Sequence, residues 1–352
     1  MAKMSFLKFI FETPKRYFMQ NIFPAQYSTL SPTALKDYLI DAYQLDPSTT
    51  CRLLIRNVSD TYILENESRK YIFKIYRDAH RKRNEIEAEV ELLNILKANG
   101  NSVSYPITDV NGKQIQQFNA IEGLRNGVMF SFAEGKVILD LENTHLFQLG
   151  QDIATLHQST STIKLNNARP IFNFETTLFE PLRDLKPHFI EMPEEFEYLT
   201  NIADKVVKKF ERFDISKFSY GYCHYDFFPK NFHFDEAGKI TFFDFDFAGE
   251  GYLINDLMSF LNHYFFHQLN NLISKEQAAE DFNIFLNAYQ KVRPLTEDEL
   301  KAIPYLGITF HIFFLKFFYD NYDDWSNAFL TPRYTKHRVT LIKKWEEMYC
   351  NF

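Results

Sequence analysis

A chain of 352 residues is too long for one small hydrophobic core, so two domains or two lobes are expected. Hydrophobic residues make up 45% and charged residues 24%, a balance that excludes an intrinsically disordered chain and is typical of globular proteins. The net charge of -7 argues against a non-specific nucleic-acid-binding protein, because neutralising phosphates requires basic surfaces.

Cysteine usage and apolar patterning favour a cytoplasmic protein without a membrane anchor. The three cysteines lie far apart and are odd in number, so they form neither a zinc motif nor a disulfide framework. The N-terminal apolar run is interrupted by Lys8 and lacks the cleavage site of a signal peptide. Leu306–Tyr319 is the most apolar later stretch, but His311 and Lys316 interrupt it, and it predicts a buried helix rather than a membrane span.

The first third of the chain predicts a small β-rich lobe. Residues 1–34 form an N-terminal extension, and Ser31 followed by Pro32 is a good start signal for a helix over "SPTALKDYLIDAY". The β-type runs "CRLLIRNV", "TYILEN" and "KYIFKIY" are separated by short turn sequences, which indicates an antiparallel meander. A helix is then expected over "RKRNEIEAEVELLNILKANG", where one apolar stripe contains Ile86, Val90, Leu93 and Leu96.

More β-type sequence follows, and from about Val137 the pattern is mostly helical, with a single β interruption after residue 230. We therefore predict an α+β fold made of a small antiparallel β lobe over residues 35–130 and a larger helical lobe over residues 131–352. The joint between the lobes is expected near Phe130–Gly135.

The β interruption lies in "HYDFFPKNFHFDEAGKITFFDFDF", His224–Phe247, which places four Asp among eight Phe. The segments "FHF" and "KITFF" flank the turn sequence "DEAG", which predicts a β-hairpin. This hairpin would bring Asn231 and Asp244 together at one end, with Asp226 on the approaching loop. Carboxylate and amide oxygens of this kind suit Mg²⁺, and a carboxylate free of the metal can accept a proton from a hydroxyl.

An alternative is that these aspartates only form turns and cap strands. That explanation fits Asp235 in the turn, but Asp226, Asp244 and Asp246 are each enclosed by aromatic residues. Because burying an unpaired carboxylate is costly, these three require partner groups or a cation.

The spacing His224-x-Asp226-x4-Asn231, followed by "FDFD" from Phe243 to Asp246, resembles the catalytic loop and metal-binding Asp of the aminoglycoside phosphotransferase and choline kinase superfamily. The resemblance extends roughly from Leu35 to Trp345. It implies a two-lobed protein-kinase-like fold that uses ATP and Mg²⁺ to phosphorylate a hydroxyl group. In this reading the β-rich lobe binds the nucleotide, and the helical lobe is catalytic and binds the acceptor.

The resemblance also implies roles for individual residues. Asp226 would be the catalytic base, Asn231 and Asp244 would hold Mg²⁺, and Asp246 would bind a second metal ion or support Asp244. The residues implied to contact ATP are Lys74 in "YIFKIY", Ser59 and Asp60 in the hairpin "NVSDTYIL", and the backbone near Ser131 and Ala133. His224 would be structural, and Asp256 would anchor backbone N–H groups of the catalytic loop or cap a helix. The family usually has Gly at the position of Tyr225, so the loop packing is expected to differ there.

Lys74 is expected to pair with a glutamate of the long helix. At about 100° per residue, Glu89 falls within the apolar sector between Leu93 and Leu96, whereas Glu85 lies at its edge. A carboxylate on the inner face needs a cation, so the sequence predicts a Lys74–Glu89 ion pair that supports nucleotide binding.

We therefore expect an ATP- and Mg²⁺-dependent phosphotransferase acting on a hydroxyl of a small molecule, such as an amino alcohol, an aminoglycoside or a sugar-like compound. The acidic and aromatic stretch "YDNYDDW", Tyr319–Trp325, is a candidate for recognising a cationic acceptor, or else a solvated loop. The alternatives are a protein Ser/Thr kinase, a non-catalytic nucleotide-binding protein and a metal-dependent phosphohydrolase. No nucleic-acid or membrane partner is expected.

Overall fold

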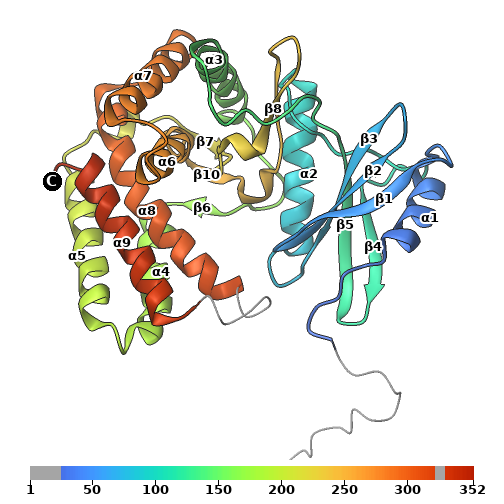
Figure 1. The fold of residues 1–352 in the computed structure, drawn as a ribbon, viewed down its shortest axis with the longest axis horizontal. Helices are drawn as coiled ribbons and strands as arrows, with labels where there is room; N and C mark the ends of the chain where they lie inside the picture. Colours follow the sequence, from blue (N-terminus) through green and yellow to red (C-terminus); the bar gives the residue numbers. More distant parts are fainter. Residues whose placement is uncertain (1–24, 322–329) are drawn as a thin grey trace, which may run out of the picture.

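The computed structural model describes residues 25–321 and 330–352, which form two lobes (Figure 1). The smaller lobe is built on an antiparallel sheet with the strand order β1-β2-β3-β5-β4. Its strands are β1 (Thr50–Arg56), β2 (Ser59–Glu65), β3 (Lys70–Tyr76), β4 (Ile115–Ala120) and β5 (Gly123–Ser131). The first three strands are the predicted meander, and each pairs with the next in sequence.

Two helices accompany this sheet. Helix α1 (Pro32–Tyr43) begins where predicted, because the Ser31 hydroxyl accepts a hydrogen bond from the Ala34 N–H. It packs Leu35 and Leu39 against one face of the sheet, in a core with residues such as Tyr62 and Phe73. Helix α2 (Arg83–Ala98) lies between the sheet and the larger lobe, as Figure 1 shows, and buries the predicted apolar stripe.

Strand register decides which side chains face the larger lobe. Directly paired residues of antiparallel strands share a face, and the ladder pairs Thr61 with Lys74 and Lys74 with Val128. Val128 belongs to the core shared with α2 and the helical lobe, whereas Ile75 belongs to the core beneath α1. Lys74 therefore projects from the face that the helical lobe approaches.

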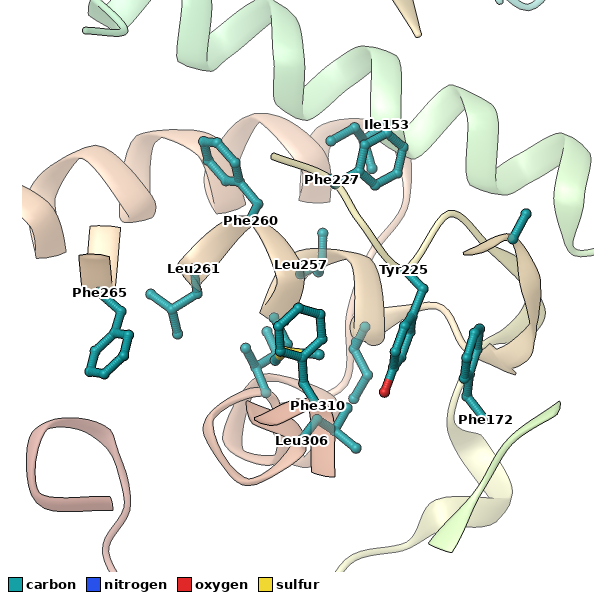
Figure 2. Close-up of a cluster of buried hydrophobic side chains, with 14 of the residues drawn as sticks. Ile153, Phe172, Tyr225, Phe227, Leu257, Phe260, Leu261, Phe265, Leu306 and Phe310 are labelled. Atoms are coloured by element: carbon teal, nitrogen blue, oxygen red, sulfur yellow. The ribbon is translucent and has the colours of Figure 1, made fainter. Parts of the chain in front are cut away.

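The larger lobe is mainly helical, which confirms the predicted fold class. Its helices are α3 (Asn143–Thr160), α4 (Glu180–Leu185), α5 (Pro193–Phe210), α6 (Ile254–Leu269), α7 (Lys275–Val292), α8 (Glu297–Asn321) and α9 (Pro332–Tyr349). Helix α6 is buried over most of its length and packs against α8, with Leu257, Phe260 and Phe310 in the same apolar cluster (Figure 2). Burial of these aromatic and aliphatic side chains supplies the main stabilising force of the lobe.

Helix α8 contains the stretch predicted to be a buried helix. By length and composition it is apolar enough to cross a membrane, but 61% of its most apolar window is buried inside the protein. The indole N–H of Trp345 on α9 donates to the Pro304 carbonyl within α8 at 2.7 Å. The packing of α8 is therefore that of a core helix.

The predicted hairpin is confirmed as β8 (Phe232–Phe234) and β9 (Ile240–Phe242). The Asp235 carboxylate accepts from the N–H groups of Ala237 and Lys239, as expected of a turn-forming residue. The hairpin is not the only β structure of this lobe, contrary to our expectation. A second small sheet has the order β6-β10-β7, with β6 (Ile171–Phe172), β7 (Tyr220–Cys223) and β10 (Gly249–Tyr252). These strands are too short to show an alternating pattern in the sequence.

The β8–β9 hairpin is bonded both to the α2–β4 segment of the small lobe and to the connection that leads from β5 into the larger lobe. On one side, residues 102–104 exchange backbone hydrogen bonds with Phe242 at 2.8 and 3.0 Å. On the other, Lys136 exchanges two backbone hydrogen bonds of 3.0 Å with Phe234. The hairpin that carries the site residues is therefore part of the joint between the lobes.

Candidate active site

The loop that carries Asp226 is fixed by one buried carboxylate. Asp256, in the first turn of α6 and fully buried, accepts from the backbone N–H groups of His224 (2.8 Å) and Tyr225 (2.7 Å). Its Oδ2 also lies 2.9 Å from Nε2 of His157 on α3. This arrangement confirms that Asp256 anchors the loop backbone, and a carboxylate with several donors is a strong anchor.

His224 holds the loop by a hydrogen bond, as predicted. Its Nε2 lies 2.9 Å from the Phe243 carbonyl, so it ties the loop to the residue that precedes Asp244. The next residue, Tyr225, adopts a left-handed conformation with φ of 66°. That conformation explains a preference for Gly at this position. Here the buried Tyr225 ring stacks on Phe172 with ring centroids 3.6 Å apart (Figure 2), which supplies packing that Gly lacks.

Asp226 and Asn231 are brought together as the sequence predicts. The Asn231 side-chain N–H donates to both Oδ2 and the backbone carbonyl of Asp226, each at 2.8 Å. Burial raises the pKa of Asp226, although the Lys230 ammonium, 3.0 Å from Oδ2, acts in the opposite direction. A carboxylate whose pKa is raised binds a proton more readily, which suits a general base.

Asp244 differs from Asp226 in exposure and in backbone conformation. Its side chain is 47% exposed, and its backbone is left-handed with φ of 62° and ψ of 59°. Lys74 Nζ lies 2.7 Å from its Oδ1, so β3 of the small lobe and the end of the hairpin meet at this point. Burial alone would lower the pKa of Lys74, but the charges of Asp244 and Asp246 outweigh that effect and raise it.

Asp246 is buried and surrounded by donors. Its Oδ1 accepts from Arg81 Nε at 3.0 Å, and its Oδ2 lies 3.0 Å from His80 Nε2 and 3.4 Å from Lys74 Nζ. Burial would raise its pKa, yet these cationic and donor groups hold the pKa of Asp246 well below its usual range. Both oxygens are thus engaged by protein groups, which favours the supporting role for Asp246 over that of a metal ligand.

The predicted Lys74–Glu89 ion pair is not formed at direct contact in the described structure. Glu89 is buried, as its position in the apolar sector predicted, but the ion pair within 4.0 Å that it makes is with Arg169, at 3.9 Å. Burial raises the pKa of Glu89, and the nearby charge of Lys74 opposes this rise. Lys74 pairs with Asp244 and Asp246 instead of with Glu89. Glu85 is no substitute, since it lies 3.6 Å from Arg81.

The residues predicted to contact the nucleotide fall into two groups. Ser59 shares the sheet face of Lys74, because its ladder partner is Tyr76. Asp60 pairs with Ile75 on the opposite face, is fully buried, and lies 3.5 Å from Arg125. A nucleotide contact by the Asp60 side chain is therefore contradicted, because the strand turns that residue toward the core beneath α1.

The predicted adenine contacts lie in the connection that leaves β5. The Ser131 carbonyl accepts from the Ser104 hydroxyl at 2.5 Å, and the Ala133 carbonyl lies 2.7 Å from Nδ1 of His233. These bonds fix the connection against the α2–β4 segment and against β8. The acidic stretch "YDNYDDW" lies largely outside the described residues, which end at Asn321 and resume at residue 330.

The donor set fits a hard divalent cation. Asp244 presents an accessible carboxylate, and Asn231 uses its N–H group on Asp226, which leaves its amide oxygen for another partner. The N–H of Phe243 donates to the Asn231 carbonyl at 3.0 Å, so Asn231 lies beside the residue that precedes Asp244 at the end of the hairpin. Oxygen ligands of this kind, few in number, match Mg²⁺ bound together with phosphate oxygens.

Three residues of this site were not identified from the sequence. They are His80 and Arg81, in the loop between β3 and α2, and Arg169, in the segment after α3. Each contacts the Asp244–Ala248 segment only through the tertiary fold. The one available signal was the requirement that the aromatic-flanked Asp246 has a cationic partner.

The sequence profile of the phosphotransferase enzyme family (APH) matches residues 50–295. The chain belongs to this family. It is 30% identical over 294 residues to a protein of unknown function from Synechocystis sp., covering 82% of this chain and 79% of that protein. It is 28% identical over 255 residues to the amicoumacin kinase of Bacillus subtilis, covering 70% and 73%.

Among solved structures, an amicoumacin kinase in complex with AMP-PNP, Ca²⁺ and Ami superposes with a TM-score of 0.71 at 20% identity, covering 90% of this chain and 94% of that one. At that identity the superposition shows the shared kinase-like fold. Family membership makes this protein a phosphotransferase with an alcohol group as acceptor.

Proposed function

We propose that this phosphotransferase uses Mg²⁺ and ATP to phosphorylate a hydroxyl group of a small molecule, such as an amino alcohol, an aminoglycoside or a sugar-like compound. The observation that carries the proposal is the meeting of Lys74, Asp244 and the Asp226–Asn231 pair at the joint between the lobes. The similarity to an amicoumacin kinase supports a small acceptor. A cytoplasmic location belongs to the same proposal and fits the free thiols of all three cysteines.

Each residue then has a defined task. Mg²⁺, held by Asp244 and Asn231, would neutralise charge on the ATP phosphates. Lys74, already the cation nearest to Asp244, would contact those phosphates and orient the transferred group. Asp226 would accept the proton of the acceptor hydroxyl. The hydroxyl oxygen would form a bond to the γ-phosphorus of ATP as the bond between that phosphorus and the ADP oxygen breaks. Lys230, 3.0 Å from Asp226, would then lie beside the acceptor.

The nucleotide part of the proposal is tested by calorimetry with ATP in the presence and absence of Mg²⁺. We expect Asp226→Asn to leave Mg-ATP binding nearly intact, because its side chain bonds to Asn231 and Lys230 rather than presenting a free oxygen pair. Asp244→Asn removes a formal charge from the metal site and should weaken Mg-dependent binding by about tenfold or more. The opposite pattern would reverse the two roles.

The acceptor part is tested by an ATP-consumption screen with amino alcohols, sugars, aminoglycosides and a generic protein substrate. Turnover with one of the small molecules, abolished in Asp226→Asn, is the expected result. Turnover with the protein substrate alone would instead identify a protein kinase.

A further inference from the structure

The segment from Asp244 to Ala248 is strained at its first residue. A non-glycine residue in the left-handed conformation of Asp244 costs of order 1–3 kcal/mol and persists only where the surroundings fix it. In this segment the backbone carbonyls are fixed by two arginines that come from distant parts of the chain. The contacts of these arginines therefore bear on how the proposed metal ligand is held.

Arg169 makes four hydrogen bonds to backbone carbonyls. Its Nη2 donates to Phe245 (3.0 Å) and Asp246 (2.6 Å), and its Nε donates to Ala248 (2.6 Å). Its Nη1 donates to the carbonyl of Glu85 at 3.0 Å, in the first turn of α2. The side chain is wholly buried, and a guanidinium is suited to this task because its donors form a rigid fork.

Arg81 holds the same segment from the small lobe. Its Nη2 and Nε donate to the Asp246 carbonyl at 2.8 and 3.1 Å, and Nε also donates to the Asp246 carboxylate. The neighbouring His80 reaches the second carboxylate oxygen. One residue, Asp246, thus receives donors on its carbonyl and on both side-chain oxygens, from both lobes.

The charges of this cluster are balanced within the fold. Burial lowers the pKa of Arg169, while Glu89 at 3.9 Å opposes that effect. Asp246 provides the counter-charge for Arg81. Glu89 therefore supports the arginine that holds the segment, in place of the direct contact with Lys74 that the sequence suggested.

We infer that Arg169 and Arg81 are positioning residues that hold Asp244 in its metal-binding conformation. They do so through their hydrogen bonds to Asp246, which serves as their shared partner rather than as a second metal ligand. The inference rests on the proposed Mg-ATP site and adds residues that act on the metal through Asp244. Partners of this kind, which orient a metal ligand, typically contribute 10–100-fold to metal affinity.

The test compares Arg169→Lys with Arg183→Lys, the same substitution in an exposed ion pair with Glu175. Lysine keeps the charge but cannot reach four carbonyls. The readout is the ratio of ATP dissociation constants measured by calorimetry without and with Mg²⁺. We expect this ratio to fall about tenfold or more in Arg169→Lys and to stay unchanged in Arg183→Lys. A ratio that stays within about twofold of the wild type, even with a lowered melting temperature, would overturn the inference.

A second measurement keeps the inference separate from the proposed function. Hydrogen exchange of the Phe245–Ala248 amides in the protein without nucleotide should become faster in Arg169→Lys, and unchanged exchange would refute the positioning role. If the wild type shows no Mg-dependent ATP binding, the proposed function fails, and the exchange result alone decides the inference. Should Arg169→Lys not fold, Asp246→Asn is used for both measurements, with the same expected directions.

Discussion

The loop His224–Asn231 and the segment Phe243–Ala248 carry the two principal carboxylates of the site, and they are held in opposite ways. In the loop, one buried carboxylate, Asp256, accepts from backbone N–H groups. In the segment, buried guanidinium groups donate to backbone carbonyls. The loop is therefore held by a negatively charged side chain, and the segment is held by positively charged side chains.

The origins of the anchors differ as well. Asp256 and its partner His157 lie on α6 and α3, so the loop that carries Asp226 is anchored within the helical lobe. The segment with Asp244 is held partly by His80 and Arg81, which belong to the small lobe. The position of the proposed general base therefore does not depend on how the lobes are arranged, whereas that of the proposed metal ligand does. Lobe movement is common in enzymes that close around a nucleotide.

The largest expected effect is on catalysis by the loop carboxylate. Asp226→Asn should lower turnover by ~10²–10⁴, the usual contribution of a positioned general base. The measurement is the steady-state rate with the acceptor found in the screen, and Asp235→Asn, in the exposed hairpin turn, serves as the control with unchanged rate. Equal losses in the two variants would argue against a special role for Asp226.

The anchor of the loop can be broken directly. Asp256→Ala leaves the N–H groups of His224 and Tyr225 without an acceptor. Because each unsatisfied buried group costs about 1–3 kcal/mol, the free energy of unfolding should fall by roughly 2–6 kcal/mol. Urea unfolding measures this change. Asp281→Ala removes a buried helix carboxylate that, among the described residues, accepts from Gln277 alone, and this variant should lose less. Similar losses would show that Asp256 does no more than an ordinary helix carboxylate.

Loop packing at Tyr225 should have a smaller effect. Tyr225→Gly relieves the left-handed strain, of order 1–3 kcal/mol, but removes a buried aromatic ring, which typically costs about 3–5 kcal/mol. We expect a net loss of up to about 4 kcal/mol in the free energy of unfolding. Tyr225→Phe keeps the ring on Phe172 and should lose less than about 1.5 kcal/mol. A stabilised Tyr225→Gly would mean that strain outweighs packing in this loop.

The smallest expected effect is on the pH dependence of stability. Because burial raises the folded-state pKa of Asp226, the protonated carboxyl stabilises the fold at low pH, and this contribution is lost as the pH rises through the raised pKa. At pH 7 the neutral variant Asp226→Asn should therefore melt at a higher temperature than the wild type. The difference should shrink as the pH falls to about 4, the ordinary pKa of Asp. A wild type that melts higher at pH 7 would contradict the direction of this shift.

The parts of the site that were predictable from sequence are those encoded by local patterns. The hairpin follows from "DEAG" between β-type runs, and it alone brings Asn231 and Asp244 together. The inward position of Glu89 follows from helix periodicity. Its counter-ion was mispredicted because Arg169 is 80 positions away, in a segment that carries no periodic pattern. Asp60 was misplaced because the end of a hairpin does not reveal which face a strand residue occupies.

The bonding of the β8–β9 hairpin to the small lobe has a mechanical consequence. The α2–β4 segment, at residues 102–104, bonds to Phe242, and Lys136, in the connection that leaves β5, bonds to Phe234. A rotation between the lobes that preserves these bonds would have its axis close to the hairpin. Lys74, on β3 of the small lobe, lies away from that axis. Opening of the lobes would therefore lengthen its 2.7 Å contact with Asp244.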